Sequence, residues 1–287
     1  MVCWAFNFVA LKLVYGQIDP STLALTRFAV MWGVLALICR LAGFSLRYAK
    51  EDFIRLMTLG FLSMGVYIIV FLEGMQRTTA TDGAILLATS PIWTALIAVL
   101  FRHERFSWGA LGGAVVAFGG VAFVVLSGSQ GGHGQVIGNV LILISALLWA
   151  LCAVLTRPMV EKYPPIQALT LSLPGALPLL LVYGLWSTVQ TPWMSLSTVT
   201  WLSFLHVCLL AGVVGFIGFY AGVKQIGSGN AMLYQYFVTP LAAGFAWLVL
   251  GQPPAPLQLI GLVIVVMGVV WSTRSRGASP PPLSEPG

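Results

Sequence analysis

Two sets of residues in this chain recur at nearly the same spacing. One set lies 149 positions apart: Pro91, Gly112 and Gly119 recur as Pro240, Gly261 and Gly268. The other lies 145 positions apart: Trp4, Ala5 and Pro20 recur as Trp149, Ala150 and Pro165, and the basic Lys12 as Arg157. Because the two offsets differ by four residues, one duplication with a short insertion accounts for both. The chain is therefore predicted to fold as two related halves.

The composition places both halves in lipid. Hydrophobic residues make up 59% of the 287 positions, charged residues make up 8%, and the mean hydropathy is +0.94. Soluble chains carry about 25% charged residues, so this chain has too little polar surface to cover a water-facing exterior. Counting apolar runs of roughly 17–25 residues as membrane spans, we predict ten: 1–15, 22–41, 53–75, 83–101, 108–126, 137–160, 167–186, 201–222, 229–250 and 255–273.

The basic residues predict the orientation. Of the 14 lysines and arginines, 11 fall on one side of the predicted spans: Arg40, Arg47, Lys50, Arg55, Arg102, Arg105, Arg157, Lys162, Lys224, Arg274 and Arg276. The remaining three, Lys12, Arg27 and Arg77, lie toward the other side. The positive-inside rule makes the first side cytoplasmic, with both termini inside. The net charge of +6 therefore reports orientation, and we expect no nucleic-acid partner.

Five spans per half is an odd number, so the second half must enter the membrane with the opposite orientation. We predict an all-α membrane protein of ten transmembrane helices, arranged as two inverted five-helix repeats. The repeats are expected at 1–126 and 137–273, with a Gly/Ser-rich periplasmic linker at 127–136 and a disordered cytoplasmic tail at 274–287. An inverted hydrophobic duplication is typical of secondary transporters, in which one repeat rocks against the other.

Several motifs carry a resemblance to a known family. In the first half they are Trp4 to Lys12, Asp19-Pro20, Leu25-Thr26-Arg27, Thr78-Thr79-Ala80, Gly83 to Leu87, Ser90-Pro91 and Glu104-Arg105. In the second half they are Trp149-Ala150, Gly229-Asn230-Ala231, Thr239-Pro240, Gly251-Gln252-Pro253 and Leu259-Ile260-Gly261. Over about residues 1–273 the chain resembles the EamA family of the drug/metabolite transporter superfamily. The resemblance implies a ten-helix inner-membrane carrier. Many such carriers export amino acids and other small amphipathic metabolites, and some import vitamins or metabolites such as riboflavin-like solutes.

The chain departs from that family in two places. The family usually has an acidic residue in two Gly-Glu-like corners; Glu104 holds the first, but Gln252 stands in the second. The opening helix also lacks the lead-in that usually precedes the tryptophan. Its fifteen residues make about 22 Å of helix, short of a ~30 Å hydrocarbon core. We expect that the start codon is assigned too late; unusual tilt is the alternative.

Two prolines are candidates for a gate. Pro91 and Pro240 occupy equivalent places in the fourth and ninth spans, each after a hydroxyl residue, Ser90 and Thr239. Proline removes a helical hydrogen bond and clashes with the preceding turn, so a kink is expected. A purely structural kink, with the hydroxyl satisfying the freed carbonyl, is one interpretation. Because the prolines recur symmetrically, we favour a paired gating element.

A polar and aromatic cluster, Tyr234-Gln235-Tyr236, lies in the ninth span and has no polar counterpart in the first half. An unsatisfied amide in hydrocarbon costs several kcal/mol. We predict that Gln235, with Tyr234 or Tyr236, faces a cavity between the repeats and binds substrate there. The alternative is a hydrogen bond that joins the ninth helix to a neighbour.

Residues of other spans are predicted to contribute to the same substrate site. Asn7 and Trp149 lie on the first helix of each half, and Tyr67 lies in the middle of the third helix, where its hydroxyl needs a partner. Trp4 is a similar candidate. For the two tryptophans, anchoring at the membrane interface is the stronger alternative because they lie near predicted helix starts.

Ionisable residues inside spans are functional candidates by default. Lys12, Arg27, Glu73 and, more weakly, His206 belong to this group. Arg27 lies near the outer end of its helix, where its side chain can snorkel to the surface. Glu73 and Arg77 are four apart and can pair on one helix face. A hydrogen-bonded, structural His206 is preferred, and proton coupling through Glu73 or His206 is the alternative.

Other classes of protein find little support. The histidines lie in separate contexts, no serine lies in a nucleophile elbow and no phosphate-binding loop is present, so we expect neither an enzyme nor a cofactor. The four cysteines lie in apolar runs and are expected to be small buried hydrophobes. The acidic Glu51, Asp52 and Glu104 are expected to be solvated partners of nearby basic residues. A channel would show a repeated carbonyl or charged filter, and the sequence has no such pattern, so a channel is the less favoured alternative to a carrier. The expected partners are a small-molecule substrate and the lipid bilayer. The protein is expected to be a monomer.

Overall fold

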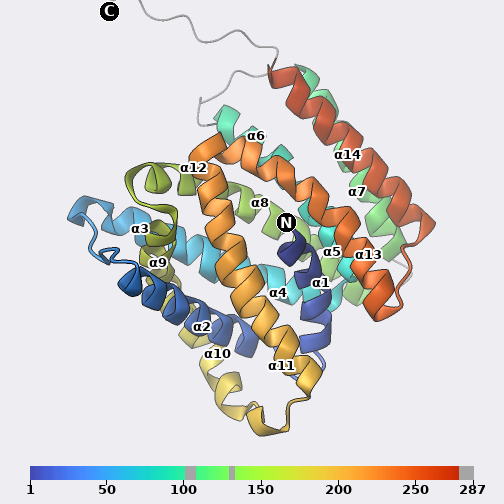
Figure 1. Ribbon diagram of the computed structural model, residues 1–287. Helices are drawn as coiled ribbons and strands as arrows, with labels where there is room; N and C mark the ends of the chain where they lie inside the picture. Colours follow the sequence, from blue (N-terminus) through green and yellow to red (C-terminus); the bar gives the residue numbers. More distant parts are fainter. Residues whose placement is uncertain (101–107, 129–132, 278–287) are drawn as a thin grey trace, which may run out of the picture.

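The computed structural model describes residues 1–100, 108–128 and 133–277, and in these residues every regular element is helical (Figure 1). The first half contains α1 (Val2–Val14), α2 (Pro20–Leu41), η1 (Lys50–Asp52), α3 (Phe53–Gly60), η2 (Phe61–Val66), α4 (Tyr67–Arg77), α5 (Ala80–Leu87), α6 (Ser90–Leu100) and α7 (Trp108–Gly128). The second half contains α8 (His133–Lys162), α9 (Pro165–Ser172), η4 (Leu173–Ala176), α10 (Leu177–Gln190), η5 (Trp193–Ser195), α11 (Thr198–Leu205), η6 (His206–Val214), α12 (Gly215–Leu233), η7 (Tyr234–Phe237), α13 (Val238–Leu250) and α14 (Pro256–Gly277).

These elements join into ten passes within the described residues, as predicted. Five continuous helical segments are long and apolar enough to cross a membrane: 20–41, 50–77, 134–162, 165–190 and 198–232. Shorter apolar helices cover 2–14, 111–124, 234–250 and 256–272, and the pair α5 and α6 supplies the remaining pass. Gly227 has a φ of 80°, which ends one pass inside α12 and starts the next, because glycine adopts this conformation without strain.

The fourth and ninth passes are broken at equivalent places. In the first half, α5 ends at Leu87 and α6 begins at Ser90, directly before Pro91. In the second half, the 3-10 segment η7 separates the end of α12 from α13, which contains Pro240 as its third residue. The expected irregularity is therefore present in both halves, on the N-terminal side of each proline.

The hydroxyl groups at these breaks do not all act as expected. Ser90 Oγ donates to the Leu87 carbonyl at 2.6 Å, which satisfies a carbonyl in its own pass. Thr239 Oγ1 instead donates to the Ala84 carbonyl of α5 at 3.2 Å. The two broken passes are thus linked to each other.

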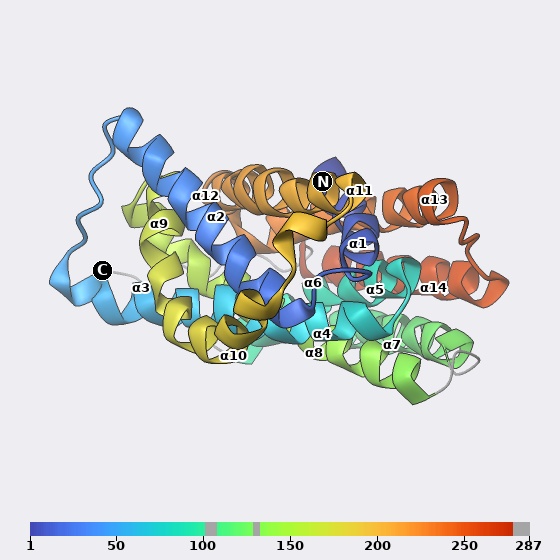
Figure 2. The ribbon, with the colours of Figure 1, turned by 90° about the horizontal axis from the view of Figure 1, so that it is seen from below.

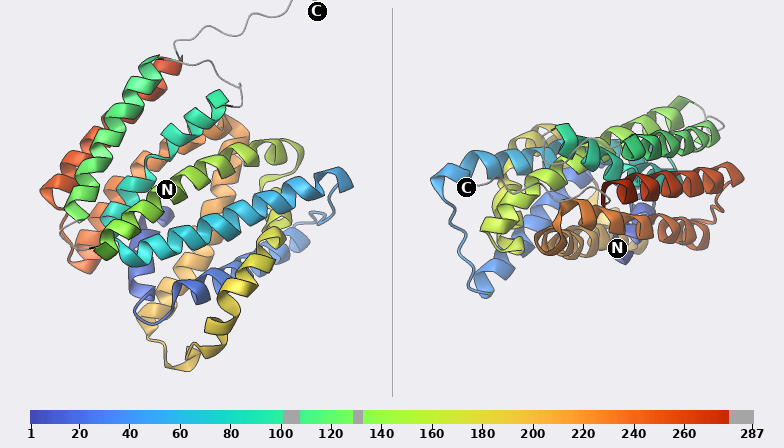
Figure 3. Two further views of the ribbon diagram at one scale, coloured as in Figure 1. Left: turned by 180° about the vertical axis from the view of Figure 1, so that it is seen from behind. Right: turned by 90° about the horizontal axis from the view of Figure 1, so that it is seen from above.

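Helices α7 and α14 form a pair at one edge of the molecule (Figures 1 and 3). Gly113 lies against Gly268, and Gly120 lies against Gly261, so the two helices run antiparallel. A Cβ atom at any of these positions would lie 2.4–2.8 Å from atoms of the opposite helix. The glycines allow this close approach, because small residues let the two helix backbones come together. The contacts, however, use Gly113 and Gly120, while the duplicated Gly119 has nothing within 4 Å of its Cβ position.

Figure 2 shows the remaining helices with α12 and α13 along one face of the bundle and α4 and α8 along the opposite face. Large apolar side chains are exposed around the outside, among them Leu37, Val182 and Leu248. This surface suits lipid, where exposed apolar atoms cost nothing. Of the four cysteines expected to be buried, Cys39, Cys152 and Cys208 are, whereas Cys3 near the start of α1 is only partly buried.

Asp52 pairs with a basic residue, as expected, but the expectation that it is solvated is wrong, since the residue is 1% exposed. Asp52 Oδ2 accepts hydrogen bonds from Tyr163 Oη and from Lys162 Nζ, each at 2.6 Å. Lys162 also pairs with Glu51 at 2.7 Å. Burial and the hydrogen bond to Asp52 raise the pKa of Tyr163, which keeps the hydroxyl protonated as a donor. These contacts tie the start of α3 to the end of α8, and we call this end of the bundle the Asp52 end.

The predicted boundaries are only partly within the described residues. Helix α7 runs to Gly128 and α8 begins at His133, so the predicted linker 127–136 is partly helical and partly outside the description. Helix α14 continues to Gly277, so the residues from 274 to 277 are helical and not the start of a disordered tail. Residues 278–287 and Glu104 lie outside the described residues. Gln252 follows the left-handed Gly251 that ends α13, and it is exposed.

Candidate functional site

A cavity lies in the middle of the bundle, between the two halves of the chain. It encloses about 530 Å³ of space between atoms, including the part open to the surface. Its walls come from seven of the passes: the first, second, third, fourth, sixth, eighth and ninth. The lining residues are Trp4, Asn7, Phe8, Arg27, Tyr67, Ile68, Phe71, Ala84, Leu87, Ala88, Trp149, Phe216, Gln235 and Val238.

The duplicated tryptophans meet at this cavity. The rings of Trp4 and Trp149 pack edge to face with centroids 5.7 Å apart, and Phe216 lies within 5.7 Å of both. Tyr67 stacks on Trp149 at 5.2 Å. Trp149 is 2% exposed, which overturns the interpretation of Trp149 as an interface anchor. An aromatic wall, contributed by both halves, therefore forms one side of the cavity.

Irregular backbone surrounds the cavity at matching places in the two halves. The π-helical segment η2 directly precedes Tyr67, and the π-helical segment η6 directly precedes Gly215 and Phe216, 149 positions after Tyr67. Trp4 Nε1 donates to a backbone carbonyl of η6, that of Ala211, at 2.9 Å. Backbone of this kind is tolerated at membrane depth where it lines a cavity. The breaks in the fourth and ninth passes also border the cavity, since Ala88 and Gln235, which lie at these breaks, line it.

Several polar atoms that line the cavity are buried and have no hydrogen-bond partner within the described part of the chain. They are Asn7 Oδ1, Arg27 Nη1, Trp149 Nε1 and Gln235 Oε1. A buried donor or acceptor without a partner costs about 1–3 kcal/mol, and more when it is charged. Polar groups that remain unpaired in one cavity indicate a site at which a polar solute completes the hydrogen bonds.

For Arg27, the structure decides between the two interpretations that the sequence allowed. Arg27 was a functional candidate, with snorkelling to the outer surface as the alternative, and the structure contradicts the alternative. The side chain is 5% exposed and lines the cavity. Its helix begins at Pro20, so Arg27 lies about 10 Å along the helix axis from that end.

The six residues predicted to bind substrate do not all reach the cavity. Asn7, Tyr67, Trp149 and Gln235 line it together. Tyr234 is 50% exposed and Tyr236 is half-buried, and neither is a lining residue. Adjacent residues of a helical segment point in different directions, about 120° apart in the 3-10 segment η7, so the two tyrosines point away from the wall that Gln235 joins.

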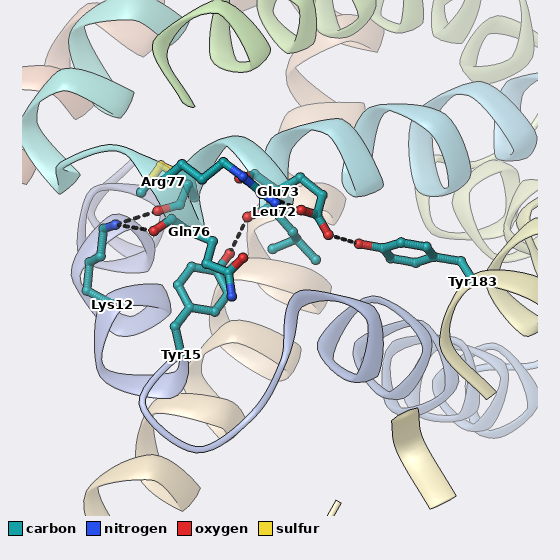
Figure 4. Close-up of polar contacts among 8 residues, drawn as sticks. Lys12, Tyr15, Leu72, Glu73, Gln76, Arg77 and Tyr183 are labelled. Atoms are coloured by element: carbon teal, nitrogen blue, oxygen red, sulfur yellow. Dashed lines mark hydrogen bonds and ion pairs between the residues drawn. The ribbon is translucent and has the colours of Figure 1, made fainter. Parts of the chain in front are cut away.

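Two other ionisable candidates, Lys12 and Glu73, make structural contacts near the end of α4 (Figure 4). Glu73 forms the expected i,i+4 salt bridge with Arg77 and also accepts a hydrogen bond from Tyr183 of α10. Lys12 Nζ donates to the carbonyls of Met75 and Gln76. These contacts link α1, α4 and α10, and Glu73 is not among the residues that line the cavity.

The side chain of His206 has a hydrogen-bond partner, in agreement with the structural role preferred from the sequence. Its Nε2 atom lies 2.9 Å from the Cys3 carbonyl, and its ring packs edge to face on Phe6 at 4.9 Å. These contacts fasten the start of α1 to η6. They give His206 a structural role beside the cavity, which it does not line.

A second buried acid joins the two halves at the end of the bundle opposite the Asp52 end. Asp82, at the start of α5, is fully buried. Its carboxylate accepts from Gln258 Nε2 at 2.6 Å and from Gln135 Nε2 at 2.8 Å. Thr78 donates to Asn139 nearby. We call this set of contacts the Asp82 cluster, and the sequence analysis did not single it out because Asp82 falls in a loop between predicted spans.

Comparisons with known proteins agree on one family. A family model described as the EamA-like transporter family matches residues 1–126 and, a second time, residues 136–274. A probable terminal-alkyne amino-acid exporter of Streptantibioticus cattleyicolor is 24% identical, covering 96% of this chain and 91% of its own length. The uncharacterized transporter YdfC of Bacillus subtilis is 27% identical, covering 94% of this chain and 87% of its own. A crystal structure of a protein 17% identical to this chain has a TM-score of 0.68 and covers 96% of this chain and 95% of that one, which shows a shared fold.

Proposed function

Because this chain belongs to the EamA-like transporter family, we propose that it is a secondary transporter that moves a small amphipathic metabolite across the bacterial inner membrane. The observation that carries the proposal is the central cavity, which combines an aromatic wall with buried polar atoms that lack partners. Such a cavity suits a solute with one polar end and one apolar end. Asn7, Tyr67, Trp149 and Gln235 are proposed to contact it.

Movement is proposed to follow alternating access between two inverted repeats. The antiparallel pairing of α7 with α14 is the arrangement that an inversion of equivalent helices requires. The broken passes at Pro91 and Pro240 then act as paired gates, because each half-helix can tilt about its break. In the structure, the Asp82 cluster and the Asp52–Lys162 contacts join the two halves at opposite ends. Opening either end requires that the corresponding contacts break.

The direction proposed is export, with an amino-acid-like solute as the first class to test. Support comes from the amino-acid exporter of Streptantibioticus cattleyicolor that this chain resembles over most of its length. Both termini are proposed to lie in the cytoplasm, on the basis of the 11 basic residues on one side. The protein is proposed to act as a monomer. Reporter fusions after residue 132 should then report a periplasmic location, and fusions after Arg276 a cytoplasmic one.

Reconstitution tests this function directly. Purified protein in vesicles of defined orientation should accelerate the movement of at least one labelled solute from a panel of amino acids and vitamins. Exchange accelerated by solute on the far side would support a carrier, because a channel shows no such acceleration. Movement of a riboflavin-like solute inward would support import instead. No solute movement above protein-free vesicles would refute the transporter assignment.

A further inference from the structure

Three charged side chains are buried in the described part of the chain, and their surroundings differ. Asp52 pairs with Lys162 and accepts a hydrogen bond from Tyr163. Asp82 accepts hydrogen bonds from two glutamine amides. Arg27 has no carboxylate within ion-pair distance among the described residues, and its Nη1 atom has no hydrogen-bond partner. Within these residues, two of the buried charges are satisfied by the fold, and the third faces the cavity.

We propose that Arg27 is the anchor for a carboxylate of the transported solute. The proposal rests on the proposed function and names the chemistry that the cavity selects. A guanidinium is planar, stays charged at all physiological pH values and matches a carboxylate with two parallel hydrogen bonds. An isolated guanidinium at membrane depth is costly, and such charges are retained where they bind ions or solutes. An anionic group placed against Arg27 satisfies both the charge and the orphaned Nη1 donor.

The other unpaired atoms describe the rest of the solute. Asn7 Oδ1 and Gln235 Oε1 are hydrogen-bond acceptors without donors, and both line the same cavity as Arg27. A hydrogen-bond donor next to the carboxylate, such as an amino group, would satisfy these oxygens. Trp149 and Phe216 present aromatic surface for an apolar body. The arrangement selects a small carboxylate-bearing solute with an adjacent donor and an apolar side group.

The duplication supports a solute with two different ends. The positions equivalent to Arg27 and Asn7, 145 residues later, are Ser172 and Cys152, and the position equivalent to Gln235, 149 residues earlier, is Leu86. None of these three equivalents lines the cavity. Two aromatic pairs of the cavity, Trp4 with Trp149 and Tyr67 with Phe216, in contrast come from equivalent positions in the two halves. The charged and amide groups thus break the symmetry of an otherwise symmetric cavity, as an asymmetric ligand requires.

The test uses a matched pair of probes, L-phenylalanine and L-phenylalaninol, which differ in that the alcohol replaces the carboxylate. Binding to the purified wild-type protein in detergent is followed by quenching of tryptophan fluorescence. The wild type should bind phenylalanine about tenfold or more tightly than phenylalaninol, since a hydrogen bond to a charged group contributes about 1.5–3 kcal/mol. Arg27→Leu should bind the two probes equally. Arg27→Lys should keep a smaller preference for phenylalanine, because lysine retains charge but loses the paired geometry.

Two controls separate a binding role from a structural one. Arg157→Gln removes an exposed arginine that pairs with Glu161, and it should keep the wild-type preference. Arg27→Leu without ligand should unfold at the same temperature as the wild type or higher, because a leucine there removes an unpaired buried charge. A large drop in unfolding temperature for Arg27→Leu would show that Arg27 holds the fold together and would overturn the proposal.

The remaining outcomes are equally decisive. Equal binding of both probes by the wild type, failure of both probes to bind, or an unchanged preference in Arg27→Leu, would each overturn the anchor role. The transporter assignment is judged separately, by solute movement in wild-type vesicles. Movement without any preference for carboxylates would refute the anchor alone, and an Arg27-dependent preference in a protein that moves no solute would refute the transporter assignment alone.

Discussion

Replacing Gly120 of α7 with alanine should weaken the contact between α7 and α14, whereas the same change at the neighbouring Gly119 should not. A Cβ atom at Gly120 would lie 2.7 Å from both the Gly261 carbonyl oxygen and the Val265 amide nitrogen of α14. Ordinary van der Waals contact begins at 3.4 Å, so the helices must separate by about 0.7 Å. A Cβ atom at Gly119 meets nothing within 4 Å.

The size of the effect follows from this shortfall. A gap of 0.5–1 Å forfeits about a quarter to a half of each dispersion contact along the helix pair. Together with backbone shifts, overpacking of this kind costs about 1–3 kcal/mol. Both variants gain the same helix propensity, about 1 kcal/mol, when glycine becomes alanine. The propensity cancels when the two variants are compared, so Gly120→Ala should be about 1–3 kcal/mol less stable than Gly119→Ala.

Thermal unfolding in detergent measures this difference. Cys39, Cys152 and Cys208 are buried, so a thiol-reactive fluorophore reports unfolding as these groups become exposed. All variants are heated at one fixed rate, because unfolding of such proteins is often irreversible. Gly120→Ala should unfold several degrees below Gly119→Ala. The reverse order would show that the helices pack through the duplicated Gly119 and would refute the contact described above.

Three further predictions concern transport. Gln235→Leu should abolish or redirect transport while membrane expression stays near normal; unchanged transport would mean that Gln235 joins helices only. Pro91→Ala and Pro240→Ala each restore a backbone hydrogen bond, and the two variants should bias cysteine accessibility toward opposite faces of the membrane. Both variants should transport more slowly. Equal accessibility in the two variants, with normal transport rates, would show that the breaks are static packing features. Gln258→Leu leaves Asp82 without one partner at a cost of about 1–3 kcal/mol, and should raise thiol labelling of cysteines introduced near the Asp82 cluster; labelling equal to that of the wild type would show that this contact does not hold that end closed.

Much of the fold follows from the sequence because its evidence is local. Ten apolar runs of membrane-spanning length predict ten helices, and the proline at each break removes a backbone donor wherever the chain places it. The duplication adds that equivalent residues lie at equivalent depths. The structure then brings the equivalent Trp4 and Trp149, for which the sequence favoured anchoring at the interface, together in the candidate site, where the two rings meet.

The rotation of each helix was decided only by the tertiary structure. A helix that is apolar on all sides has no polar face to show which side turns inward. For this reason Tyr234 and Gln235 could not be told apart, and Gly119 could not be distinguished from Gly120. Arg27 illustrates the same limit: its place in the sequence allows the side chain to reach the surface or to turn inward, and the packing of α2 against its neighbours turns it into the cavity. Sequence determined how many membrane passes there are and which residues of the two halves are equivalent, and packing determined which side chains face one another.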